Sequence, residues 1–67
     1  MTVWRDARGQ PMATISQGVA VRDGRLVAVY FAAIPGETQE RKTYACAKRA
    51  IDGWIARSRL QLTASHV

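Results

Sequence analysis

The stretch TISQGVAVRDGRLVAVYFAAI, residues 14–34, decides the fold because it has the pattern of an antiparallel β-hairpin. Asp23-Gly24 lies near its centre, and Asp-Gly is a favoured pair for a two-residue turn in which both residues take a positive φ angle. Closing the hairpin there sets the register, with Arg22 opposite Arg25. The pattern therefore predicts two long antiparallel strands, over about residues 14–22 and 25–34.

The two faces of this hairpin differ in composition, because side chains along a strand alternate between faces. One face offers an apolar surface for a helix to cover and carries Ile15, Val19, Val21, Leu26 and Tyr30. The other face of the second strand is also apolar, with Val27, Val29 and Phe31. Strands that are apolar on both sides are typical of sheets covered on both faces. We therefore expect Trp4 and the N-terminal segment, or a second subunit, to cover these three side chains.

The chain after the hairpin has two interpretations. Pro35-Gly36 suits the central positions of a type II turn. The polar segment that follows fits a short third strand at the sheet edge, and it equally fits a helix start with Thr38 or Thr43 as the N-cap. We favour a third strand over about residues 40–43, followed by a helix over about residues 44–59.

The helix is indicated by apolar residues spaced three and four apart, which form one stripe: Tyr44, Ala47, Ile51, Trp54 and Ile55. We expect Trp54 to be the main anchor of the helix on the sheet. A second stripe of small residues, Cys46, Ala50 and Gly53, fits close packing against the sheet or against the backbone of a partner. The predicted fold class is α+β, with an antiparallel hairpin or three-stranded sheet packed by one C-terminal helix.

The length of 67 residues indicates a single domain, residues 1–67. Residues 1–12 have no period and are expected to form an N-terminal arm, and residues 63–67 a frayed tail. So short a chain buries only about 60% of its unfolded surface. One cysteine and one histidine cannot supply a disulfide or a structural zinc site. A homodimer, or another partner, is therefore expected to add stability.

Residues suited to catalysis are few. His66 lies at the poorly ordered end of the chain, and Cys46 sits in an alanine-rich setting typical of a small packing residue. The aspartates show no paired-carboxylate spacing, and the glycines form no phosphate loop. We expect no enzyme activity, no cofactor and no metal. The absence of a disulfide framework and of a long apolar segment predicts a cytoplasmic protein that does not enter membranes.

The basic residues are the strongest functional signal. The net charge is +5, and eight of the ten basic residues are arginines, whose planar guanidinium suits phosphate and carboxylate recognition. Such charge supports salt-dependent binding without sequence reading, although an arginine-rich solvated surface would have the same composition. The expected polyanion-binding or partner-binding residues lie at the hairpin tip and around the helix start: Arg22, Arg25, Arg41, Lys42, Lys48 and Arg49.

The stretch KTYACAKRAIDGWIA, residues 42–56, preceded by a short hairpin, resembles the end of small phage and prophage accessory proteins of β-β-(β)-α type. The same region also resembles the truncated ribonuclease-H-like domain of HicB-type antitoxins, through Pro35, Gly36, Thr38, Ala47, Ala50, Ile51 and Trp54.

These resemblances, together with the apolar strand, imply a phage-type accessory factor that binds a host protein or nucleoprotein complex. Small inhibitors of bacterial defence complexes, anti-CRISPR proteins among them, act in this way. The alternative is a basic nucleic-acid-binding module that uses its arginines without sequence specificity.

Overall fold

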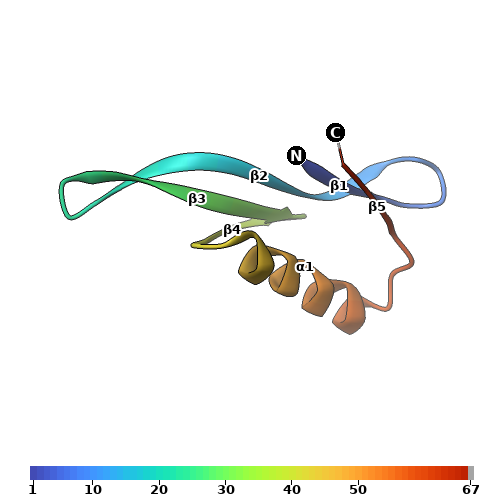
Figure 1. Cartoon of the computed structure of the whole chain (residues 1–67). Coiled ribbons are helices and arrows are strands. Elements are labelled where there is room, and N and C mark those ends of the chain that lie inside the picture. The colour runs from blue at the N-terminus through green and yellow to red at the C-terminus, as the bar shows by residue number, and fades with distance from the viewer. Residues whose placement is uncertain (67) are drawn as a thin grey trace.

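The structure is a computed structural model that describes residues 1–66, and its fold is α+β, as predicted. Five antiparallel strands form one open sheet in the order β4-β3-β2-β1-β5, and one helix packs on a single face of it (Figure 1). The elements are β1 (Thr2–Arg5), β2 (Pro11–Arg22), β3 (Arg25–Ile34), β4 (Glu37–Arg41), α1 (Tyr44–Ser58) and β5 (Thr63–His66).

The β2–β3 hairpin has the predicted turn and register. Asp23 and Gly24 have φ angles of 53° and 74°, and Arg22 lies opposite Arg25. The ladder continues without a shift to Thr14 opposite Ala33. The Asp-Gly turn thus fixes which side chains share a face along the whole hairpin.

The third strand is confirmed, but it begins three residues earlier and ends two residues earlier than the predicted residues 40–43. Gly36 has a φ of 82°, and the tight turn places Glu37 directly opposite Ile34, so β4 begins there. The alternative helix start at Thr38 is therefore wrong. Thr43 is the N-cap, and its Oγ1 accepts a hydrogen bond of 3.1 Å from the backbone N–H of Cys46.

Strands occupy half of the predicted N-terminal arm and the described part of the predicted frayed tail, so both predictions are wrong there. Residues 2–5 form β1, which pairs with β2 on one side and with β5 on the other. A four-residue strand has too few side chains to show an alternating pattern, which is why β1 could not be predicted. The turn that follows is held by the Asp6 carboxylate, which accepts hydrogen bonds of 2.9 Å from the backbone N–H groups of Arg8 and Gln10. Val67 lies outside the described residues.

The core lies between α1 and the adjoining half of the sheet. Ile51 is fully buried and Trp4 is 4% exposed, whereas Trp54 is only half-buried. The expectation that Trp54 is the main anchor is therefore wrong: Ala47 and Ile51 anchor the helix, and the buried tryptophan comes from β1. Trp4 also does not cover Val29, because it lies on the helix side of the sheet.

The helix covers only part of the sheet face assigned to it. α1 begins just after β4, where the Tyr44 ring meets the Tyr30 ring edge-on at 6.0 Å, and it runs away from the hairpin tip (Figure 1). Ile15 is therefore buried, but Val19 and Val21 are exposed. The far half of the hairpin projects from the body, and the molecule measures 43 × 24 × 20 Å.

Truncation of the two tryptophans tests the core. We expect Trp4→Ala to lower the free energy of unfolding by about 3–5 kcal/mol, the usual cost of removing a large buried aromatic side chain. Trp54→Ala should cost less, because part of the Trp54 ring already contacts water. Chemical denaturation of both variants measures the difference. A larger loss for Trp54→Ala would contradict this assignment of the core.

Substitution of Gly53 tests the stripe of small residues. A Cβ at Gly53 would meet only the flexible Arg57 side chain, at 3.2 Å, so this glycine does not pack closely on the sheet as one interpretation expected. Gly53→Ala should therefore raise the free energy of unfolding by about 1 kcal/mol, because alanine is the better helix former. Gly18→Ala is the contrasting control and should destabilise the fold, since its Cβ would overlap the Phe31 ring.

Candidate binding surface

A groove runs over the hairpin on the face opposite α1, and it brings together four of the residues expected from sequence. Its volume is about 470 Å³. Val27 and Val29 form an apolar floor, and Arg22 and Lys42 lie at the rim. We call this the hairpin groove; its remaining lining residues are Asp23, Ala28 and Glu40.

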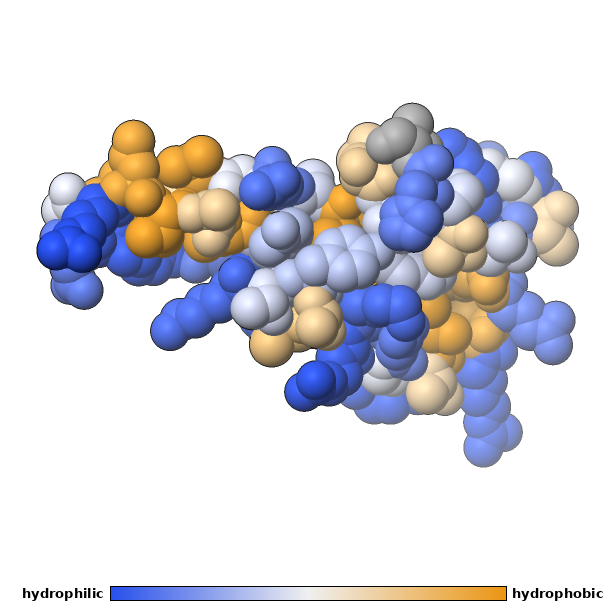
Figure 2. Space-filling view, viewed as in Figure 1, coloured by the Kyte–Doolittle hydropathy of each residue, from blue (hydrophilic) through white to orange (hydrophobic). Residues whose placement is uncertain are grey.

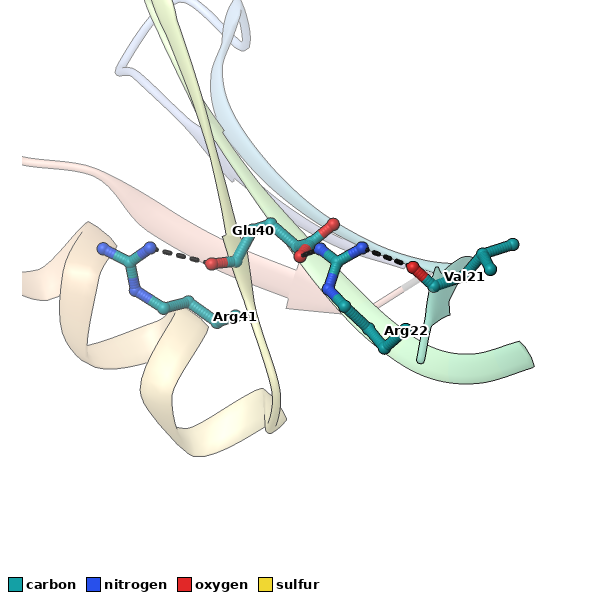
Figure 3. A network of polar contacts seen from close by, with 4 residues as sticks. All are labelled: Val21, Arg22, Glu40 and Arg41. Carbon is teal, nitrogen blue, oxygen red and sulfur yellow. Dashed lines mark hydrogen bonds and ion pairs between the residues drawn. The ribbon is translucent and has the colours of Figure 1, made fainter. Parts of the chain in front are cut away.

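Polar contacts hold one side of the hairpin groove in place (Figure 3). The Arg22 guanidinium donates to the Glu40 carboxylate and also to the Val21 carbonyl oxygen, the latter at 2.9 Å. Arg41 Nη1 donates to the Glu40 carbonyl oxygen at 2.8 Å. The Arg22 and Glu40 side chains are 55% and 36% exposed, and ion pairs this open to water contribute only about 0–1 kcal/mol. The pair therefore orients Arg22 more than it stabilises the fold.

The apolar side chains opposite the helix are less open than the sequence led us to expect. Val29 is 4% exposed, and Val27 and Phe31 are half-buried. Gly18 has no side chain, so the Phe31 ring lies against β2 at that point. The chain itself thus covers much of this face, although Val27 and Val29 still reach the hairpin groove.

The most exposed large apolar side chains of the hairpin lie on its other face, the one that α1 leaves open. Val19, Val21 and Leu26 are 65%, 62% and 76% exposed. Figure 2 shows hydrophobic side chains gathered over this projecting part of the molecule. Sequence reasoning missed them as a surface because it placed the helix over them.

The other expected cations lie apart from the hairpin groove. Arg41 and Arg49 line a second hollow with Cys46 and Ala50. Lys48 Nζ donates to the Asp52 carboxylate at 2.9 Å, and this hydrogen bond, reinforced by the negative charge, raises the pKa of Lys48 above its ordinary value.

Two ion pairs, Arg22–Glu40 and Lys48–Asp52, involve side chains of residues 1–66. With ten basic residues in the chain, eight have no carboxylate partner within the described part. Arg25 at the hairpin tip is one of these.

A hydrogen-bonded chain that sequence reasoning missed joins both chain ends to the helix. Thr2 is buried, and its Oγ1 lies 2.7 Å from Tyr44 Oη and 3.0 Å from His66 Nδ1. The three groups fasten α1 and β5 to β1. Within residues 1–66 no group of three or more His, Cys, Asp or Glu side chains is placed to hold a metal ion.

The helix of the described chain is too short and too polar to cross a membrane. Comparison of the chain with protein-family models, with curated proteins and with solved structures yielded no match.

Neutralising Glu40 tests the charge balance of the hairpin groove. Glu40→Gln raises the net charge from +5 to +6 and leaves Arg22 without its carboxylate partner. We expect a change of at most about 1 kcal/mol in the free energy of unfolding, but a higher salt concentration for elution from a heparin column. Glu37→Gln makes the same charge change at the far end of β4 and should shift elution less. Equal shifts would show that the groove has no special attraction for anions.

Proposed function

We propose that this chain is a small non-enzymatic binding protein, a phage-type accessory factor that modulates a host protein or nucleoprotein complex in the bacterial cytoplasm. The observation that carries the proposal is the hairpin groove, which combines an apolar floor at Val27 and Val29 with cations at Arg22 and Lys42. This groove is suited to a protein segment in which an apolar side chain lies beside a carboxylate.

A protein partner fits the hairpin groove better than a phosphate backbone does. Phosphates gain little from an apolar floor. Asp23 and Glu40 line the same groove, and they repel a nucleic-acid backbone, which carries a charge at every nucleotide, more than a segment with a single carboxylate. Arg22 is already engaged by Glu40, so Lys42 is the cation most available to a partner. A partner carboxylate would bind Lys42 directly and could exchange with Glu40 at Arg22.

The shape of the molecule supports the same proposal. The β2–β3 hairpin projects beyond the helix (Figure 1), and the hairpin groove lies where the hairpin meets Glu40 and Lys42 at the end of β4. A projecting ribbon can reach a recessed surface on a larger complex. A small inhibitor that binds a bacterial defence complex by occupying such a surface would need no catalytic residues.

Nucleic-acid binding is a second candidate because one observation favours it. Eight of the ten basic side chains have no carboxylate partner within residues 1–66. Arginines at the hairpin tip and on the outer side of α1 could bind phosphates without reading sequence. Such binding would weaken steeply as salt rises, because bound counterions are released from the nucleic acid.

Affinity capture with matched charge reversals separates these candidates. Tagged wild-type protein, Lys42→Glu and Arg8→Glu are incubated with bacterial lysate, with and without nuclease. Arg8 lies in the β1–β2 turn, at the opposite end of β2 from the hairpin tip, so its reversal has the same charge but a remote position.

We expect a defined partner protein that survives nuclease, is retained by Arg8→Glu and is lost with Lys42→Glu. Equal retention by both variants would contradict a role for the hairpin groove. The nucleic-acid candidate would be supported by two results together: nuclease removes all captured protein, and both variants bind a DNA duplex equally less tightly than the wild type does.

A further inference from the structure

The open side of the projecting hairpin, on the same face as α1, is apolar and carries no charge. We call it the ribbon face, and it consists of Val19, Val21, Leu26 and Ala28, all exposed. The tip arginines do not share it, because the register turns Arg22 and Arg25 to the opposite face. An anionic partner would therefore find no cation here, and the surface requires an apolar partner.

A hollow of about 170 Å³ lies at the base of the ribbon face, where the helix begins. Its walls include the rings of Tyr30 and Tyr44, which meet edge-on with centroids 6.0 Å apart. The hydrogen bond between the Thr2 and Tyr44 hydroxyl groups fixes the position of the second ring. The remaining walls are formed by Met1, Thr2, Ile15, Gln17 and His66. The hollow therefore offers two aromatic rings to an apolar side chain, within walls that also carry polar groups.

A side chain that fits such a hollow, Leu26, is present on the same face. Leu26 is 76% exposed at the tip, and Leu26, Ala28 and Tyr30 follow one another along one face of β3. At about 3.3 Å per residue, Leu26 lies about 13 Å from Tyr30. A two-fold axis near Ala28 would thus bring Leu26 of one copy to the hollow of another, and the reverse contact would form at the same time. Two-fold interfaces require this reciprocity.

From this juxtaposition we infer that the protein forms a two-fold homodimer through the ribbon face, with Leu26 of each copy seated between Tyr30 and Tyr44 of the other. This places the dimer on the opposite side of the hairpin from Val27, Val29 and Phe31, the face expected from sequence. The inference does not depend on the proposed function.

Stability favours a second copy as the occupant, and the absence of charge on the ribbon face permits it. Two chains of net charge +5 repel each other, and the neutral ribbon face lets them meet with Arg22 and Arg25 directed outward. A two-stranded ribbon is marginally stable in water, so each hairpin gains a covering layer from the other. The ribbon face consists of only four side chains, so we expect the interface to bury less than about 1,200 Å² in total, the range of weak and transient complexes. We therefore expect micromolar affinity.

Sedimentation equilibrium tests the dimer directly. The wild type is measured at concentrations up to about 1 mM, which is high enough to detect a dimer with a binding free energy of only about 4 kcal/mol. With micromolar affinity, its mass should approach twice the monomer mass of 7.4 kDa. Leu26→Gln should weaken the dimer at least tenfold without unfolding the monomer, because Leu26 is largely exposed there. Arg25→Gln, which changes the adjacent residue on the opposite face, should not weaken the dimer. A monomeric wild type, or equal effects of the two variants, overturns the inference.

Cysteine cross-linking tests the proposed contact between Leu26 of one copy and the hollow of the other. In a Cys46→Ser background, Leu26→Cys combined with Gln17→Cys should oxidise to a covalent dimer. A bond within one chain is excluded because these positions lie four residues apart along the ladder, farther than a disulfide can reach. Leu26→Cys combined with Ser16→Cys is the matched control, since Ser16 faces the other side of β2. Cross-linking of the control pair alone, or of neither pair, overturns the proposed contact.

Discussion

The single helix is shorter than the hairpin on which it packs, and the rest of this structure depends on that difference in length. The 15 residues of α1 span about 22 Å, whereas the 12 residues of β2 span about 40 Å. One such helix can cover only about half of the hairpin, and Ile51 fixes which half by packing against Ile15 and Trp4. The other half must project, with apolar side chains exposed on the face that a longer helix would have covered. The ribbon face exists because of this shortfall.

The local elements could be predicted from the sequence, because each depends on residues close together in the chain. Asp23-Gly24, Pro35-Gly36 and Thr43 act through their own φ angles and hydrogen bonds, so the hairpin, the second turn and the helix start were predictable. The pairing of β1 with β5 was not, since it joins residues more than 55 positions apart and neither strand is long enough to show alternation. The position of Trp4 in the core follows from that pairing and was missed with it.

The binding surface was predictable only in part, for a related physical reason. Strand alternation correctly grouped Val27 and Val29 on one face, and the register placed Arg22 on the same face. Lys42 joins them only because β4 pairs with β3 and ends beside the hairpin, and no local pattern contains that information. The position of α1 along the sheet decides which apolar side chains remain exposed. Sequence periodicity predicts which side of the helix faces the sheet, but not where along the strands the helix lies.

The Asp-Gly turn also determines how charge and apolar surface are separated on the projecting hairpin. With Arg22 opposite Arg25, both guanidinium groups lie on the groove side, and Val21 and Leu26 lie together on the ribbon face. A shift of one residue in the register would exchange the faces of every side chain on one strand. Each face would then carry both an arginine and an apolar side chain, and neither an uncharged self-association surface nor a cation-rimmed groove would remain. The two-residue turn therefore specifies the chemistry of both faces as well as the fold of the hairpin.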